Sequence, residues 1–138
     1  MTARIFLDTN ILLYSLSRAL GEASKRARAV ALLDRDDCGL SVQVLQEFYV
    51  QATRPSRAGA LSHDIAVGLI RAWGRFEIQE NTLAVMNAAL EIRAAHGFSY
   101  WDSAIIAAAR ALGCAELHTE DLSHGRVVDG VTIINPFR

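Results

Sequence analysis

Lysine is almost missing from this 138-residue sequence, in which Lys25 is the only lysine among 14 basic residues. A receiver-type phosphoacceptor domain needs a lysine late in the chain, and a P-loop hydrolase needs a G-K-[ST] tripeptide, so the sequence argues against both classes. Long apolar runs are missing as well. The longest stretch without a charged residue, 81–90, is about half a membrane span, and the apolar run 5–7 is shorter than a signal peptide requires.

Cysteine is scarce and the net charge is small. Cys38 and Cys114 are the only cysteines and lack a metal-binding or redox spacing, which predicts small buried side chains in a reducing cytoplasm. The net charge of −1 argues against nucleic-acid binding through overall positive charge. In contrast, apolar residues are abundant: a hydrophobic content of 51% and a mean hydropathy of +0.19 predict one folded domain over residues 1–138.

Short β-prone segments alternate along the chain with segments of helical pattern. Strands are expected at 4–7, 38–40, 76–78, 115–119 and within 127–135, and helices at 11–16, 22–34, 41–53, 62–73, 81–96 and 99–113. The alternation predicts a single α/β domain, with a short parallel sheet flanked by helices on both faces.

Helix boundaries and one helix face can also be predicted. Polar residues at the expected helix starts predict an N-cap at Ser62 and one at Ser41 or a neighbour, and Asn81 and Ser99 are expected to open their helices. In the helix 22–34, the helical period predicts an apolar face made of Ala27, Val30, Ala31 and Leu33.

Four acidic residues lie just after predicted strands or in predicted helices near the expected carboxyl end of the sheet. Asp8 and Asp121 come directly after two strands, Asp102 lies in the first turn of a helix, and Glu47 lies in the helix that follows another strand. Ligands of an open α/β sheet bind outside the carboxyl ends of its strands. Carboxylates gathered there repel one another unless a cation joins them, and a hard divalent ion such as Mg²⁺ or Mn²⁺ suits oxygen ligands. The pattern therefore indicates a metal site and phosphodiester chemistry.

Each acid also has a purely structural interpretation. Asp8 is a good helix cap, and Asp102 stands three residues after Ser99 as in a capping box. Glu47 is interpretable as a solvated helix residue and Asp121 as a turn residue. The helix that carries Asp102 is otherwise almost wholly apolar, which places this acid at the mouth of the core. Taken together, the four positions favour a common site.

The segments around these acids resemble, in the same order, those of the PIN domain family, the fold of the VapC toxins of bacterial type II toxin–antitoxin pairs. The resemblance begins with F-L-D-T-N-I-L at 6–12 and continues through V-L-Q-E-F at 44–48, S-Y-W-D-S-A-I-I-A-A at 99–108, L-H-T-E-D-L at 117–122 and I-N-P-F at 134–137. It spans nearly the whole chain.

The resemblance implies a Mg²⁺-dependent endoribonuclease, with Mn²⁺ as an alternative ion. Its acidic quartet would bind the metal and hydrolyse RNA by means of a metal-activated water, and it would consist of Asp8, Glu47, Asp102 and Asp121. Polar support would come from Asn10 and Thr119. The adjacent acid Glu120 is a competitor for the fourth position, but Asp121 matches the family's pattern. The resemblance also implies a cytoplasmic homodimer with a small VapB-like antitoxin as partner.

Basic and aromatic residues are the candidates for holding RNA. An acidic centre repels RNA, so phosphate contacts are expected from Arg54 and Arg57 in the loop after the Glu47 helix, with residues 25–28 as a second basic cluster. Trp101 is a candidate for base stacking, as are Tyr14 and Tyr100, whereas Trp73 is expected in the core. For His118 and His124, a capping or turn role is favoured over a zinc site, which would need a further ligand.

Two alternatives to a toxin ribonuclease remain open at this point. One is a PIN endonuclease that has no antitoxin, which a short reading frame directly upstream would argue against. The other is a catalytically weak PIN-like module that binds RNA or protein, against which the presence of all four acids counts.

Overall fold

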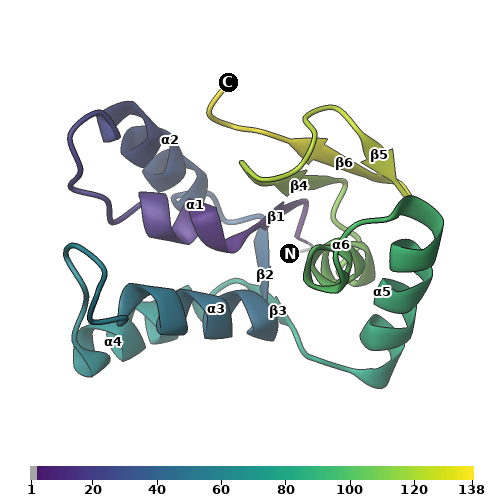
Figure 1. Cartoon of the computed structure of the whole chain (residues 1–138), viewed down its shortest axis with the longest axis horizontal. Helices are drawn as coiled ribbons and strands as arrows, with labels where there is room; N and C mark the ends of the chain where they lie inside the picture. Colours follow the sequence, from purple (N-terminus) through teal and green to yellow (C-terminus); the bar gives the residue numbers. More distant parts are fainter. Residues whose placement is uncertain (1–2) are drawn as a thin grey trace.

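The computed structural model describes residues 3–138 and has a six-stranded sheet with helices on both sides (Figure 1). The strands are β1 (Ile5–Leu7), β2 (Cys38–Ser41), β3 (Glu77–Gln79), β4 (Glu116–His118), β5 (Val127–Val128) and β6 (Val131–Ile134). The helices are α1 (Thr9–Tyr14), α2 (Ala23–Leu33), α3 (Val42–Ala52), α4 (His63–Trp73), α5 (Leu83–His96) and α6 (Tyr100–Ala111). The predicted α/β fold is confirmed.

The order of the strands places a crevice beside β1. The sheet runs β3-β2-β1-β4-β6-β5, and β1 is parallel to both of its neighbours, β2 and β4. Among the strands of residues 3–138, only the short edge strand β5 is antiparallel, in the hairpin that it forms with β6. After β1, the chain next forms β2 on one side of β1, whereas the later strand β4 pairs with the other side of β1. Such a switch in direction opens a crevice at the carboxyl ends of the strands, where ligands bind in α/β folds.

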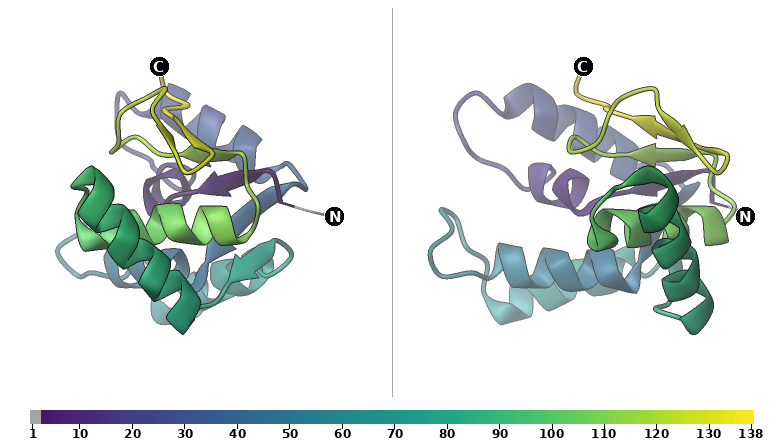
Figure 2. Two further views of the ribbon diagram at one scale, coloured as in Figure 1. Left: turned by 90° about the vertical axis from the view of Figure 1, so that its right-hand side faces the viewer. Right: turned by 45° about the vertical axis from the view of Figure 1, so that its right-hand side comes forward.

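The helices form two groups around the sheet. In Figure 1, α1 to α4 extend from one side, whereas α6 lies against the sheet with α5 packed on it; Figure 2 shows the same grouping from two other directions. Residues 103–109 of α6 are all buried, and they meet a core that includes Phe6, Leu40 and Leu117. Within residues 3–138, no helix combines the length and the apolar character that crossing a membrane requires.

Several details of the sequence-based prediction are wrong, among them the bounds of α1, which spans Thr9–Tyr14 and not 11–16. The buried face of α2 consists of Ala29, Leu32 and Leu33, whereas Ala27, Val30 and Ala31 are exposed. Both sets have helical spacing, and the set with two leucines packs inward because it buries more apolar surface.

Two further errors are small shifts of element boundaries. Helix α5 is capped by Thr82 rather than Asn81: the Thr82 side chain accepts a hydrogen bond from the backbone of Val85. Strand β3 begins at Glu77 because Phe76 is still part of the preceding turn, its N–H bonded to the Trp73 carbonyl.

Candidate active site

All four predicted site acids line one cavity of about 210 Å³ at the carboxyl ends of β1 and β4. Asp8, Glu47, Asp102 and Asp121 come from positions far apart in the sequence, and the strand order described above brings them together. The rest of the wall is made of Thr9, Asn10, Leu13, Gln51, Trp101 and Ile105. The structure therefore places all four acids in one pocket.

Asp8 is the buried acid of this cavity and also the N-cap of α1. Its Oδ1 accepts a hydrogen bond from the backbone N–H of Thr9 at 2.7 Å, and its Oδ2 accepts one from the hydroxyl of Thr119 at 2.9 Å. Burial raises the pKa of Asp8 from 3.8 to about 6. The two hydrogen bonds lower this pKa, and the charges of Glu47 and Asp121 raise it further. Ionised Asp8 is thus unfavourable in the folded protein, mainly because it is buried.

Glu47 lies half-buried on α3 with both carboxylate oxygens engaged. The Thr9 hydroxyl donates a hydrogen bond to Oε1 at 2.8 Å, and the side-chain amide of Gln43 donates one to Oε2 at 3.3 Å. Neither donor was predicted from the sequence. Thr9 stands inside the motif already singled out, and Gln43 precedes Glu47 by one helical turn, which is the signal that would have indicated it.

Asp102 and Asp121 are the two more accessible acids. Asp102 lies in the first turn of α6, and its backbone N–H donates a hydrogen bond to the cap Ser99 at 3.1 Å. Within residues 3–138, no hydrogen bond engages its carboxylate. Asp121 is exposed, and its Oδ2 accepts a hydrogen bond from the Asn10 side chain at 3.1 Å. Both carboxylates therefore have oxygens available to a ligand in the cavity.

Asn10 and Thr119 connect the two acids that follow β1 and β4. The Asn10 amide donates a hydrogen bond to the Thr119 hydroxyl at 3.1 Å, and this hydroxyl in turn donates one to Asp8. The Thr119 oxygen also accepts the backbone N–H of Asp121 at 3.1 Å. These contacts place Asn10 and Thr119 beside both acids, and their supporting role stays a prediction.

Glu120, the competitor for the fourth position, points away from the cavity. Its carboxylate lies 2.5 Å from the ammonium of Lys25 and accepts a hydrogen bond from the Tyr14 hydroxyl at 2.6 Å. Although partial burial opposes it, these bonds lower the pKa of Glu120. Asp121 lines the cavity and Glu120 does not, as the motif predicted. Lys25 is consequently paired within the protein, which weakens the case for residues 25–28 as an RNA-binding cluster.

The donor set of the cavity suits a hard divalent cation. Carboxylate oxygens predominate, joined by amide and hydroxyl oxygens, and histidine and cysteine do not line the cavity. The raised pKa of Asp8 shows that a positive charge there would be stabilising. Among residues 3–138, no three acidic, histidine or cysteine side chains already stand as a metal-binding cluster. The residues therefore fit such an ion chemically, while their side chains are not preset around it.

The predicted basic residues lie outside this cavity. Arg54 and Arg57 are exposed in the turn that follows α3. Arg57 lines a separate cavity of about 520 Å³ together with Arg18, and this cavity shares Leu13 with the acidic one. The structure thus places Arg57 in a neighbouring depression and not among the carboxylates.

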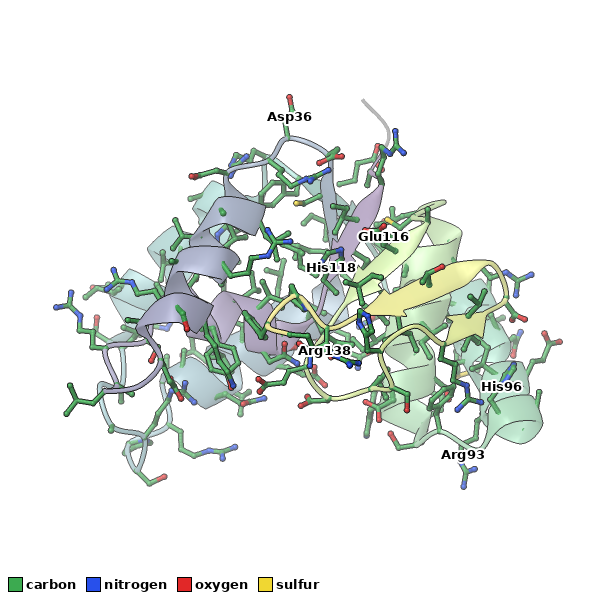
Figure 3. All side chains as sticks on the ribbon, turned by 90° about the horizontal axis from the view of Figure 1, so that it is seen from above. Asp36, Arg93, His96, Glu116, His118 and Arg138 are labelled. Atoms are coloured by element: carbon green, nitrogen blue, oxygen red, sulfur yellow. The ribbon has the colours of Figure 1, made fainter. Side chains whose placement is uncertain are left out.

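The aromatic and histidine residues have distinct surroundings. Trp73 is in the core, as predicted, packed edge-on against Phe48 at 4.8 Å between ring centroids. Trp101 is 63% exposed at the rim of the acidic cavity. The predicted capping or turn role is wrong for His118, which is buried in strand β4 with its Nε2 2.8 Å from Glu116 Oε1 (Figure 3), and burial lowers its pKa. His124 accepts a backbone hydrogen bond from Asn135, as the favoured turn role predicts.

Comparison with known proteins agrees with the geometry. Residues 5–129 match the model of the PIN domain. A toxin–antitoxin complex from Klebsiella pneumoniae contains a chain 21% identical to this one, with 97% of this chain and 98% of that chain covered and a TM-score of 0.69. The VapC20 toxin of Mycobacterium tuberculosis, which cleaves the sarcin-ricin loop, is 22% identical over 82% of this chain and 86% of that chain, with a TM-score of 0.62.

A third structure extends this set of neighbours. The FitAcB structure from Neisseria gonorrhoeae contains a chain 23% identical to this one over 96% and 98% of the two chains, with a TM-score of 0.66. No curated protein sequence matches the chain significantly. At these identities, the structural likenesses show the fold alone.

Proposed function

Because this chain belongs to the PIN domain family, whose members are typically metal-dependent nucleases, we propose that it is a Mg²⁺-dependent endoribonuclease of the VapC toxin type. The observation that carries the proposal is the convergence of four carboxylates, from four separate segments, on one cavity at the carboxyl ends of β1 and β4. Hydrolysis of a phosphodiester in such a site needs a cation that offsets the negative charge of both the acids and the phosphate.

The roles of the residues follow from their contacts. Asp8, Glu47, Asp102 and Asp121 would hold the ion, which when bound supplies the Lewis acid that activates a water and stabilises charge on the phosphate oxygens. Asp8 is oriented by the N–H of Thr9 and the hydroxyl of Thr119. The exposed Asp121 is held toward the cavity by Asn10. Asp102 has a carboxylate without protein partners in the described chain, which leaves its oxygens open to the ion or to water.

RNA, an antitoxin and a second copy of the chain are the proposed partners. Structures similar to this one come from toxin–antitoxin complexes, which supports a VapB-like antitoxin as partner. The homodimer is proposed from the family resemblance. Because the proposed substrate is RNA, we propose that the protein acts in the cytoplasm. Expression of the protein is expected to arrest bacterial growth, and co-expression of a small protein encoded beside it is expected to restore growth. Unimpaired growth with active nuclease would instead indicate a PIN endonuclease that is not a toxin.

Cleavage assays test the nuclease proposal directly. We expect the purified protein to cut RNA with Mg²⁺ or Mn²⁺ and to lose this activity with EDTA. Asp8→Asn and Asp102→Asn should each lower the cleavage rate at least about 100-fold, because loss of a direct metal ligand exceeds the usual cost of losing a supporting residue. Far-UV circular dichroism and thermal melts establish that the variants are folded.

Asp36→Asn is the matched control, since Asp36 is an exposed acid remote from the cavity (Figure 3). It should leave the rate unchanged. Cleavage that persists in EDTA, or normal rates in both site variants, would show that the acidic cavity is not the active site.

A further inference from the structure

Gln43 lies between two of the acids in the candidate site. It stands in the first turn of α3 and is 8% exposed. Its Nε2 donates hydrogen bonds to Glu47 Oε2 and to the backbone carbonyl of Trp101, both at 3.3 Å. Trp101 directly precedes Asp102, so a single amide group connects the carboxylate of Glu47 to the turn of backbone that carries Asp102.

The chemistry of the two partners fixes which end of the Gln43 amide faces them. A carboxylate oxygen and a carbonyl oxygen are both acceptors, and only the –NH₂ group has two hydrogens to give them. The opposite orientation would set three oxygens against one another. Gln43 and Glu47 are also four residues apart on α3, the spacing at which helical side chains lie over each other. The contact is therefore specific to a side chain that is both long and a double donor.

The second carboxylate oxygen of Glu47, Oε1, is held by a residue of α1. Thr9, which follows Asp8 and is 5% exposed, donates to Oε1 at 2.8 Å. The carboxylate of Glu47 is thus fixed to α1 through Thr9 and to the start of α6 through Gln43. Without Gln43, one oxygen would lose its partner and the half-buried side chain would regain rotamer freedom that binding must remove again.

We propose that Gln43 is a positioning residue that fixes Glu47 relative to Asp102 and thereby raises the affinity of the site for a divalent cation. This proposal rests on the function proposed above. Residues that orient metal ligands through hydrogen bonds commonly change metal affinity by about 10- to 100-fold when they are removed. The role is distinct from packing, because it acts through the hydrogen bonds of a single amide.

The test is a titration with Mn²⁺ by isothermal calorimetry. Gln43→Met keeps the length and volume of the side chain but removes both donors, and it should raise the Kd for Mn²⁺ about 10-fold. Gln46→Met is the matched control: the same change on the same helix, at an exposed residue that contacts Asn81 and does not line the acidic cavity. It should leave the Kd unchanged. Gln43→Leu serves as a second variant, and the titration uses whichever retains the far-UV spectrum of the wild type.

A double-mutant cycle separates positioning from a general effect on the fold. In a Glu47→Ala background, Gln43→Met should no longer change the Kd, because the carboxylate that it positions is gone. An undiminished effect in that background would overturn the proposal, as would equal Mn²⁺ affinity of Gln43→Met and wild type. If neither Gln43 variant folds, Gln43 is required for folding and not for positioning Glu47, which would also overturn the proposal. If the wild type binds no Mn²⁺ and cuts no RNA, the proposed function itself fails.

Discussion

The carboxylate of Asp8 has both a stabilising and a destabilising effect on the folded protein. Its carboxylate caps α1, which is favourable, but it is buried beside Glu47 and Asp121, and its pKa rises from 3.8 to about 6. A rise of this size means that ionising Asp8 costs the folded state about 3 kcal/mol relative to the unfolded chain. Residues of active sites often carry such a cost, since an arrangement suited to a ligand is strained without it.

The stability of the ion-free protein should therefore depend on pH through Asp8. Between pH 3.8 and about 6, the folded state binds more protons at Asp8 than the unfolded state. The contribution of this group to the free energy of unfolding thus falls as the pH rises through that window and stays low above it. Asp8→Asn removes the charge, so the variant should be about 1–2 kcal/mol more stable than wild type at pH 8. Part of the full gain is lost because an amide replaces one acceptor oxygen of the carboxylate.

Urea denaturation in EDTA at pH 8 and at pH 4 measures this difference. The gain of Asp8→Asn should disappear at pH 4, where the wild-type carboxyl is itself neutral. Asp36→Asn, at an exposed site, should show no gain at either pH. A wild-type protein more stable than Asp8→Asn at pH 8 would contradict the assignment of an unfavourable buried charge.

At the residue scale, the sequence indicated which acids line the cavity better than it indicated the contacts that they make. The cap and site interpretations of Asp8 were posed as alternatives, yet both hold geometrically, because a carboxylate has two oxygens and can cap a helix while facing a cavity. Asp121 lines the cavity and Glu120 does not, for a reason that the sequence does not contain: Glu120 pairs with Lys25, which is remote in sequence. For Gln43, the one-turn spacing before Glu47 is readable in the sequence, whereas its second partner, Trp101, lies 58 positions away and is not.

At the scale of elements, local chemistry determined most boundaries. Ser41, Ser62 and Ser99 cap α3, α4 and α6 as predicted, and Gly97 ends α5 in the left-handed conformation with φ of 76°. These features depend on near neighbours in the chain, so a sequence reveals them. The inward face of α2 depends instead on which side of the helix packs against the rest of the core, including α1. Two sets of apolar residues had the right spacing, and only the tertiary packing distinguishes them.

Close packing between β2 and the end of α6 gives a prediction at this scale. A Cβ on Gly39 would lie 2.7 Å from Leu112 Cδ1 and 3.1 Å from Ala3 Cβ, both inside normal contact distance. Gly39→Ala should therefore lower the free energy of unfolding by about 1–3 kcal/mol through overpacking. The measurement is urea denaturation.

The control for Gly39→Ala uses its main neighbour. Because Leu112 Cδ1 is the end of a flexible side chain, removing it should relieve much of the overlap. Gly39→Ala should thus cost less in a Leu112→Ala background than in the wild type. An equal cost in both backgrounds would mean that the strain lies in the strand backbone and not in its packing against α6.

Over the whole molecule, the near-zero net charge conceals an uneven distribution. The chain has 14 basic and 15 acidic residues, and four of the acids line a single cavity. The other 11 acids are outnumbered by the 14 basic residues, so the rest of the molecule carries a small formal positive charge that favours the approach of phosphates. Arg54 and Arg57 lie in the turn between α3 and α4, which projects from one end of the molecule (Figure 1).

Salt dependence of RNA binding can test whether this projecting turn contacts the RNA backbone. Each phosphate contact to a single strand contributes about 0.7 to the slope of log K against log salt concentration. Arg54→Ala combined with Arg57→Ala should therefore weaken binding and make the slope shallower by about 1.4 if each arginine contacts one phosphate. Binding is measured by fluorescence anisotropy in an Asp102→Asn background, so that the RNA stays intact.

Loss of two positive charges anywhere lowers the general attraction for RNA, and the control must remove the same charge elsewhere. Arg4 and Arg93 are exposed, at the start of β1 and in the last turn of α5, away from the acidic cavity. Arg4→Ala with Arg93→Ala should leave the slope nearly unchanged, because distant charges are screened beyond about 10 Å at 0.1 M salt. Equal slopes for the two double variants would show that RNA does not contact the turn after α3. The exposed Trp101 at the rim of the acidic cavity would then be the next candidate for contact with RNA.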